Sequence, residues 1–382
     1  MPALSVRLPQ LRKKGFRLSS IPSVALKQLF LQRTPLIDVR APVEFSMGTL
    51  PGAINLPIMD DAQRAAVGTT YKQSGREAAL ILGHELVSGE VKQSRLQGWA
   101  EYIRANPKAV LFCFRGGLRS RITQQWLAEM GIHRPLIEGG YKVARQFLRE
   151  VVDQHSQVNG PFIILSGPTG SAKTTILHDL KAIRPMVDLE ALARHRGSAF
   201  GASQSRQPTQ IDFEHAIALD LLRLSSGPER TRILIEDESR LIGRCAIPES
   251  LFTQMRASAV VYLDEPFEQR VENIFNDYVV NTPIGQGAED AALAEFAKFK
   301  NAVKIISRKL GGLRAQEILN DLEDCERDYL SHKKLDQNRA WIAKLLRYYY
   351  DPAYLQSFEK RNPEVLLRGR ADVVVDYLKQ LK

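Results

Sequence analysis

Short apolar runs, each followed by polar residues or glycine, recur along the chain between Leu36 and Asp264. Runs of this length bounded by turn-forming residues predict buried strands. After Pro283 the pattern changes to long helical periodicity with scattered lysine and arginine, interrupted at Gly311-Gly312 and at Pro352. The candidate strands cover residues 36–40, 48–57, 110–112, 162–165, 232–236 and 260–264. The pattern therefore predicts an α/β fold with a helical C-terminal region.

The order of these segments divides the chain into four expected regions. They are a basic, disordered tail at 1–20, a first α/β domain at 21–152, a second α/β domain with a parallel sheet at 153–283, and a helical region at 284–382 that packs on the second domain. A short polar break near Asp153 to Gly160 separates the α/β domains. A length of 382 residues with 44% hydrophobic residues suits two or three globular domains of ordinary core size.

One predicted strand, residues 110–112, ends at a cysteine that is followed by glycines and arginines. Glycines let such a loop curl so that its backbone N–H groups converge, and the following helix directs its positive end at the thiol. The pattern predicts an anion-binding loop around a reactive Cys113 thiolate. A buried cysteine before an ordinary turn is the alternative. The residues expected to bind the anion are Arg115, Gly116, Gly117, Arg119 and Ser120.

A second strand, residues 162–165, leads through a glycine-rich segment into a helix that begins near Lys173. The spacing is that of the phosphate-binding loop G-x-x-x-x-G-K-[ST], except that Ala172 replaces the second obligatory glycine. An alanine at positive φ costs roughly 1–2 kcal/mol, so either the loop avoids that geometry or phosphate binding is weakened. The expected phosphate-binding residues are Gly167, Gly170, Ser171, Lys173, Thr174 and Thr175.

The strand at 232–236 ends in consecutive carboxylates, where a phosphate-binding domain places the acid that holds Mg²⁺ directly or through water. Glu236 or Asp237 is the expected acid. The alternative is that these acids pair with Arg240 and Arg244 and hold no metal. The candidate basic contacts to phosphate or RNA are Arg194, His195, Arg196, Arg240 and Arg244.

The chain carries a formal charge of +10, which suits a polyanionic partner such as tRNA. Part of the excess lies in the first twenty residues, which carry five cations and no acid, and part lies on the C-terminal helices. Cations on one helical face can follow an RNA backbone, although a solvated face is the alternative. These C-terminal cations are Lys298, Lys300, Lys304, Arg308 and Lys309. No apolar run is long enough to span a membrane.

The three cysteines, Cys113, Cys245 and Cys325, are far apart in the chain. This spacing argues against a disulfide framework and against a structural zinc site, and it fits a reducing cytoplasm. Cys245 is expected to be a packing residue, with a resolving thiol as the alternative. Cys325 shows no evident chemistry.

The segments around the cysteine loop resemble the rhodanese domain. They are Leu36-Ile-Asp-Val-Arg40, Gly48-Thr-Leu-Pro-Gly-Ala-Ile-Asn-Leu-Pro57 and the loop that begins at Cys113. The same loop also fits Cys-x5-Arg-Ser, the anion loop of tyrosine phosphatases, so phosphatase chemistry is a rival. Phe112 stands where such phosphatases usually carry histidine, and the flanking strands favour the rhodanese interpretation.

The whole chain resembles the tRNA 2-selenouridine synthase family, a rhodanese domain fused to a P-loop domain. The resemblance extends from about Leu36 to Arg370 and includes segments outside the two generic loops. These are Tyr71–Gly75, Leu82–Gly89, Glu138–Lys142, Asp188–Glu190, His195–Gly201, Glu236–Arg244 and Leu345–Asp351.

The resemblance implies a cytoplasmic transferase that replaces the sulfur of wobble 2-thiouridine in tRNA by selenium. It implies selenophosphate and geranyl diphosphate as co-substrates, an S-geranylated intermediate, and an enzyme that supplies selenophosphate as a partner. Cys113 would take part in the selenium step, and Lys173 and Thr174 would hold the diphosphate. Mg²⁺ is a candidate cofactor, and no structural metal is expected.

Three other functions stay open on the sequence. An ATP-dependent tRNA sulfurtransferase would use the P-loop for nucleotide, which Ala172 disfavours. A Cys-x5-Arg phosphatase regulated by a nucleotide-binding domain would hydrolyse phosphate esters at Cys113. A non-catalytic RNA-binding scaffold would need neither loop.

Overall fold

The computed structural model describes residues 19–115, 117–157, 162–198, 200, 206–226, 232–287 and 289–381. The chain forms two compact units, one from Met1–Val151 with Thr209–Arg223 and one from Val152–Pro208 with Leu224–Lys382. Residues 1–18 of the expected tail and Gly116 of the cysteine loop lie outside the described residues. Ser20, the last residue of that expected tail, is the first residue of strand β1.

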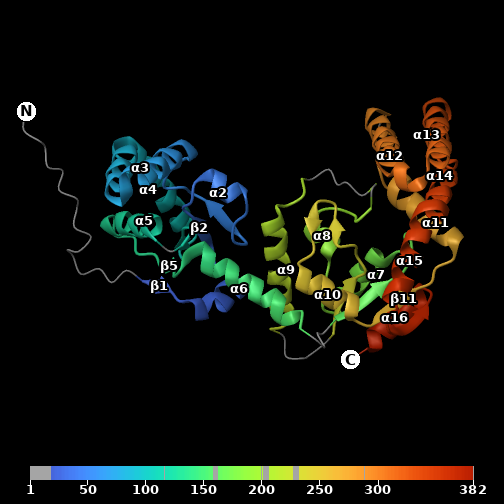
Figure 1. Ribbon diagram of the computed structural model, residues 1–382, viewed down its shortest axis with the longest axis horizontal. Helices are drawn as coiled ribbons and strands as arrows, with labels where there is room; N and C mark the ends of the chain where they lie inside the picture. Colours follow the sequence, from blue (N-terminus) through green and yellow to red (C-terminus); the bar gives the residue numbers. More distant parts are fainter. Residues whose placement is uncertain are drawn as a thin grey trace, which may run out of the picture. The chain divides into compact units, whose positions relative to one another are not determined.

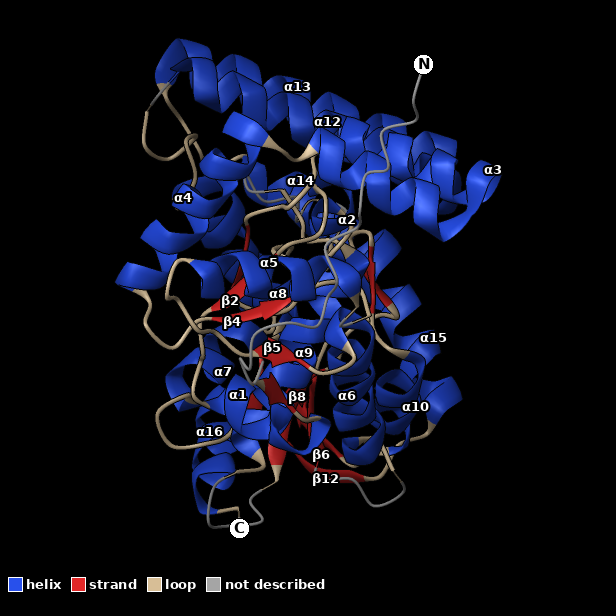
Figure 2. Cartoon of the chain, turned by 90° about the vertical axis from the view of Figure 1, so that its left-hand side faces the viewer, coloured by secondary structure: helices blue, strands red, loops and turns tan. Residues whose placement is uncertain are grey.

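The first unit is built on a parallel sheet with the order β1-β5-β4-β2-β3. Leu36, Ile37, Leu111 and Phe112 are fully buried in its centre. Figure 2 marks its strands in red, among them β2, β4 and β5. The strands are β1 (Ser20–Ile21), β2 (Leu36–Asp38), β3 (Ala53–Asn55), β4 (Val110–Phe112) and β5 (Leu136–Ile137).

Seven helices belong to the described part of this unit. Helix α3 is broken at Gly75, where φ is 83°, so that it consists of two limbs. The helices are α1 (Leu26–Leu31), α2 (Pro42–Ser46), α3 (Asp61–Leu86), α4 (Gly89–Ala105), α5 (Leu118–Glu129), α6 (Gly140–His155) and α9 (Gln210–Leu224).

Helix α9 belongs to the first unit although its neighbours in the chain belong to the second. The Thr49 N–H donates to Asp212 at 2.9 Å, and the ring Nδ1 of His215 lies 2.7 Å from the Thr49 carbonyl oxygen. Gly48 passes so close to the helix that a Cβ there would lie 2.6 Å from the Ile211 side chain. The sequence analysis placed the residues of α9 in the domain at 153–283. It did not anticipate their packing on the first unit, because the contacts join positions more than 160 residues apart.

The second unit has a parallel sheet with the order β12-β11-β6-β8-β7 and a separate antiparallel hairpin. The hairpin strands are β9 (Leu241–Ile242) and β10 (Cys245–Ala246). The sequence predicted only helices after residue 283, but Val365–Gly369 pairs with β11 as an edge strand. The sheet strands are β6 (Phe162–Ser166), β7 (Met186–Val187), β8 (Ile233–Glu236), β11 (Val260–Leu263) and β12 (Val365–Gly369).

The C-terminal helices share an apolar core that includes Phe296, Ile318, Tyr329 and Trp341. Helices α12 and α13 pack side by side, away from the sheet (Figure 1). The helices of this unit are α7 (Lys173–Leu180), α8 (Leu189–Ala193), α10 (Glu249–Ala257), α11 (Phe267–Phe275), α12 (Glu289–Leu310), α13 (Gly312–His332), α14 (Asn338–Leu345), α15 (Asp351–Arg361) and α16 (Ala371–Gln380), with π-helical segments at Asn276–Val280 and Leu346–Tyr350.

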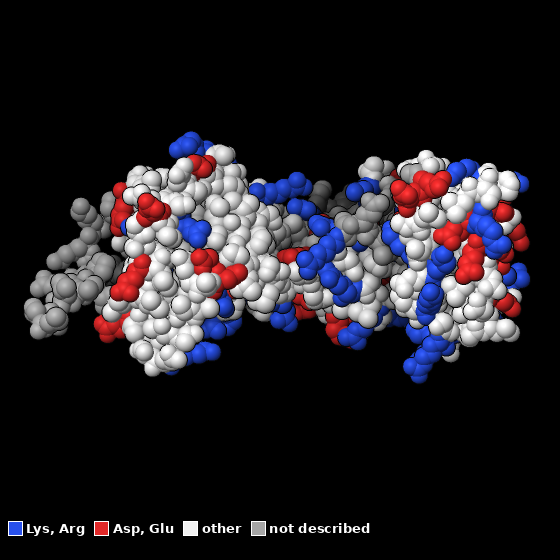
Figure 3. All heavy atoms as spheres, turned by 90° about the horizontal axis from the view of Figure 1, so that it is seen from above, with Lys and Arg blue, Asp and Glu red and all other residues white. Residues whose placement is uncertain are grey.

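Cations on the α12–α13 hairpin are interspersed with acids, as the right-hand side of Figure 3 shows. Lys298 pairs with Glu295, and Lys300 with Glu326. Exposed pairs of this kind contribute little to stability and leave the face mixed in charge. Among the described helices, none is both long and apolar enough to cross a bilayer.

We expect Gly48→Ala to lower the free energy of unfolding of the first unit by about 2 kcal/mol, because the new methyl group would overlap Ile211 and φ at this position is +135°. The measurement is urea denaturation followed by the fluorescence of Trp99 and Trp126. Gly98→Ala is the control, since a Cβ there meets nothing within 4 Å. Equal stability of Gly48→Ala and wild type would contradict the close packing of α9.

Candidate functional sites

The cysteine loop joins the carboxyl end of β4 to the start of α5. Cys113 Sγ lies 3.2 Å from Ser120 Oγ and 3.9 Å from the Gly117 carbonyl oxygen, and Cys113 is only 3% exposed. The N–H groups of Tyr141 and Lys142 donate to the carbonyls of Cys113 and Phe114 at 2.8 and 2.9 Å. The loop is thus fixed at both ends, with the thiol next to the first turn of α5.

The two arginines of this loop lie in different environments. Arg119 makes a two-pronged contact with Glu44 of α2, at 2.6 and 3.1 Å, whereas Arg115 is exposed and lies over the Phe114 ring. Burial alone would lower the pKa of Arg119, but the hydrogen bond and charge of Glu44, with the charges of Cys113 and Asp38, raise it. Arg119 is therefore the positioned cation beside the thiol. Glu44, which lies in the segment that resembles rhodaneses but was not among the predicted site residues, holds it.

Asp38 and Arg40, from the motif at the end of β2, form a buried ion pair rather than part of an open site. Arg40 donates to Asp38 through Nε and Nη2 and lies 4.1 Å from the centre of the Tyr141 ring. The His215 ring meets the Tyr141 ring edge-on, with the ring centres 6.2 Å apart. Burial lowers the pKa of His215 to about 4, so the ring is neutral at pH 7 and its Nδ1–H donates to Thr49. This cluster packs at the carboxyl end of the sheet, where Cys113 follows β4.

The phosphate-binding loop runs from the end of β6 to the start of α7. Ala172 adopts the left-handed conformation, with φ 63° and ψ 28°, so the loop does not avoid the geometry that disfavours alanine. The strain is roughly 1–2 kcal/mol. Lys173 Nζ folds back to the Gly167 carbonyl oxygen at 2.8 Å, and the Gly167 N–H donates to the Tyr354 hydroxyl at 2.7 Å.

Two side chains of α11 bind backbone carbonyls in the middle of this loop. Arg270 and Asn273 donate to the carbonyls of Thr169 and Gly170 at 3.1 and 2.8 Å. A Cβ on Gly170 would lie 2.7 Å from the Arg270 carbonyl oxygen, so this position requires glycine for space as well as for its φ of 84°. Ser171 donates to Pro168 within the loop, and Thr175 lines the adjoining pocket.

The two expected acids have different partners. Glu236 is buried and accepts from Thr174 Oγ1 at 3.0 Å. Asp237 instead binds Arg361 of α15 at 2.8 and 2.9 Å and accepts from Ser166 at 2.6 Å. Glu236 is thus the acid next to the phosphate-binding loop, and Asp237 anchors a C-terminal helix over it.

Glu190 and Glu238, which the sequence analysis did not single out, lie close to Glu236. Burial and the charge of Glu236 raise the pKa of Glu190 to about 8, and burial with the charges of Glu236 and Glu190 also raises the pKa of Glu238. A Cβ on Gly197 would meet both carboxylates, at 2.7 and 2.8 Å. Both residues stand in segments that resemble the synthase family, which was the available signal.

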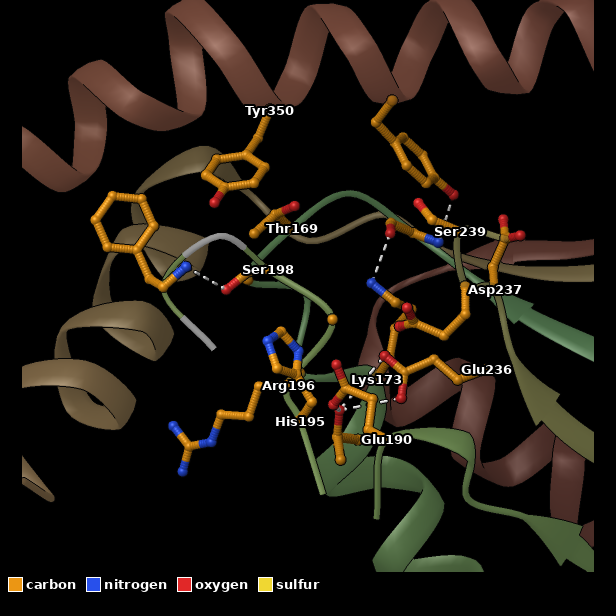
Figure 4. A pocket seen from close by; sticks show the side chains of 18 of the residues that line it. Thr169, Lys173, Glu190, His195, Arg196, Ser198, Glu236, Asp237, Ser239 and Tyr350 are labelled. Atoms are coloured by element: carbon orange, nitrogen blue, oxygen red, sulfur yellow. Dashed lines mark hydrogen bonds between the residues drawn. The ribbon is translucent and has the colours of Figure 1, made fainter. Parts of the chain in front are cut away.

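A pocket of about 1640 Å³ adjoins the phosphate-binding loop, and both of its walls come from the second unit. Figure 4 shows Lys173, Glu190 and Glu236 together on one side, and Tyr350 extending from a helix on the opposite side. The Phe and Tyr residues that line it are Phe200, Phe252, Tyr278, Phe299, Tyr349, Tyr350, Tyr354 and Phe358. The pocket therefore joins an anion-binding loop to an aromatic wall.

The pocket also includes four of the five basic candidates, Arg194, His195, Arg196 and Arg240. Arg196 donates to the Asp277 carbonyl, and Arg240 pairs with Glu249. Arg244, the fifth, does not line the pocket and donates to the Gln207 carbonyl at 2.7 Å.

Cys245 and Cys325 are both buried. Burial raises the pKa of the Cys245 thiol, and burial with neighbouring aspartates raises the pKa of Cys325 to about 12. Neither environment favours a thiolate.

We expect Glu190→Gln to stabilise the protein at pH 8 and to leave it unchanged near pH 4.5. The folded-state pKa of about 8 lies above the ordinary value of 4.5, so the folded state binds more protons between these pH values and loses stability as pH rises. Thermal unfolding at pH 5, 6.5 and 8 measures this, with the exposed Glu359→Gln as control. A pH-independent difference from wild type would contradict the assignment.

Comparison with known proteins agrees with the two units. Residues 23–145 match the family described as rhodanese-like domain, and residues 160–382 match the family described as tRNA 2-selenouridine synthase AAA domain. The chain is 48% identical to the tRNA 2-selenouridine synthase of Nitrosomonas eutropha, covering 95% of this chain and 98% of that one. It is 51% identical to that of Bdellovibrio bacteriovorus, covering 92% and 96%. The predicted architecture of a rhodanese-like domain, a P-loop domain and a helical C-terminal region is confirmed, and the chain belongs to the tRNA 2-selenouridine synthase family.

Proposed function

We propose that this protein is a tRNA-modifying transferase that replaces the sulfur of wobble 2-thiouridine by selenium from selenophosphate, through an S-geranylated intermediate. The observation that carries the proposal is the presence, in one chain of this family, of a buried thiol beside Arg119 and of a phosphate-binding loop beside an aromatic-walled pocket. The first site suits a selenium donor, and the second suits an isoprenoid diphosphate.

The prenyl step is assigned to the second unit. Lys173, Thr174 and the loop backbone would hold the diphosphate, after Lys173 releases the Gly167 carbonyl. The aromatic wall would hold the isoprenoid chain. The thiouridine sulfur then attacks the first carbon of the chain, a C–S bond forms, and the C–O bond breaks as diphosphate leaves.

The residues of this site fit a Mg²⁺ ion that would bind together with the diphosphate. Thr174 and Glu236 would supply oxygen ligands, which Mg²⁺ prefers, and a cation would relieve the repulsion among the neighbouring carboxylates. Among the described residues, no group of three or more His, Cys, Asp or Glu side chains is arranged to hold a metal. Diphosphate oxygens and water would therefore complete its coordination.

The selenium step is assigned to the first unit. An alkylated sulfur leaves as a neutral thiol once it is protonated, so prenylation prepares the nucleoside for displacement. The selenium of selenophosphate adds at C2 of the base, and the C–S bond breaks as its electron pair leaves with the prenyl sulfur, which is released as the thiol. Water then attacks phosphorus, so the P–Se bond breaks, phosphate leaves and selenium remains on C2. The Cys113 loop, with Arg119 fixed by Glu44, provides the positive charge and helix N-terminus for the phosphoryl part of the donor.

Cys113→Ala is expected to abolish selenouridine formation and to leave prenylation intact. The protein would be incubated with 2-thiouridine-containing tRNA, with selenophosphate and geranyl diphosphate added singly and together, and the nucleosides identified by mass spectrometry. Prenylated thiouridine should accumulate in the variant, whereas the buried Cys245→Ala control should behave as wild type. Unchanged thiouridine in every wild-type mixture would contradict the function, and hydrolysis of an aryl phosphate by Cys113 would favour the phosphatase alternative.

Lys173→Met is expected to slow prenylation at least about 100-fold, which corresponds to about 3 kcal/mol of lost transition-state stabilisation. Selenation of tRNA that has been prenylated beforehand should stay within twofold of wild type. Single-turnover rates for the two steps measure this, with the exposed Lys181→Met as the matched control. A prenylation rate close to that of the control would remove the diphosphate from this loop.

A further inference from the structure

A second cavity, of about 930 Å³, lies inside the first unit beside the cysteine loop. Its walls come from both limbs of α3, on either side of the break at Gly75, and from α5. The limbs face each other, since a Cβ on Gly83 would lie 3.8 Å from the Val67 side chain. The lining also includes Phe114, Leu118 and Arg119, which follow Cys113 in the chain.

The cavity combines apolar walls with a cationic border. Val67, Leu80, Ile122 and Trp126 are among its lining residues. Its charged residues are Arg64, Lys72 and Arg119, the carboxylate Glu44, which Arg64 and Arg119 share, and Arg40, whose charge is paired with Asp38. This chemistry suits an apolar chain carried by a polyanion.

Two helical glycines keep the cavity open. A Cβ on Gly68 would meet nothing within 4 Å, and a Cβ on Gly83 only an ordinary contact, although both stand inside α3, where glycine is a poor helix former. Glycine therefore stands at two helical positions where a larger side chain would occupy part of the cavity. The two glycines stand on opposite limbs.

We infer that this cavity binds the isoprenyl chain of the S-prenylated 2-thiouridine in tRNA while selenium displaces the sulfur. The inference rests on the proposed function. The chain is still attached to the nucleoside when the C–S bond breaks, so the selenium site must hold it, and the cavity is of the size that encloses small organic ligands. Each buried methylene contributes about fourfold to affinity. The chain thus binds twice, first as diphosphate in the second unit and then as thioether in the first.

The first test fills the cavity in the full-length protein. Gly68→Phe should slow selenation of previously prenylated tRNA at least tenfold and leave prenylation of 2-thiouridine tRNA within twofold of wild type. Gly68→Ala, which keeps the space, and Gly98→Phe, which places the same side chain on α4 away from the cavity, should both behave as wild type.

The second test measures binding directly. S-methyl-, S-dimethylallyl- and S-geranyl-2-thiouridine nucleosides would be titrated into the wild-type protein and into Gly68→Phe, with Trp126 in the cavity wall as the fluorescent reporter. Affinity should rise at least tenfold with each five-carbon unit. Gly68→Phe should remove that dependence.

Wild-type protein that forms selenouridine, with chain-independent nucleoside affinity and a Gly68→Phe variant as fast as Gly68→Ala, would overturn the cavity's role and leave the proposed function standing. Wild-type protein that neither prenylates nor selenates tRNA would overturn the proposed function and the occupant with it.

Discussion

Pairing of buried charge organises both units around their candidate sites. A carboxylate removed from water requires a cation or several hydrogen bonds, and a partner from another element joins the two elements firmly. Glu44 joins α2 to α3 and α5 through Arg64 and Arg119. Asp237 joins the end of β8 to α15 through Arg361, and Arg270 joins α11 to the start of α15 through Asp351. Each pair fixes the position of a helix that borders a candidate site.

Among the described residues, the carboxylates Glu190, Glu236 and Glu238 beside Lys173 form no ion pair with an arginine. Glu190, Glu236 and Glu238 repel one another, and their pKa values lie above the ordinary range because of burial and mutual charge. Lys173 meanwhile donates to its own loop. The raised pKa values mean that these carboxylates take up protons more readily than ordinary ones, and a cation bound beside them would displace those protons.

Local sequence was sufficient to predict the strands that lead into each site, because each strand, loop and helix there is continuous in the chain. Cys113 with Ser120, and Lys173 with Thr174, are neighbours in sequence as well as in space. The supporting residues could not be found this way. Glu44 lies 75 residues from Arg119, and Arg361 lies 124 residues from Asp237, so only the fold brings them together. For the same reason α9 was assigned to the wrong unit and β12 was predicted as helix, since distant partners decide how a short segment folds and packs.

The course of α9 also limits how a gene for such a protein can be assembled. The chain leaves the second unit after Pro208 and returns to it at Leu224, having contributed a helix to the first. Phe213, Ile217 and Leu221 on that helix are fully buried. A recombination event that exchanged either unit at a single junction would separate α9 from Thr49 and Gly48 and expose these side chains. We therefore expect the two units to be inherited together, because a cut at a single junction would remove α9 from the first unit.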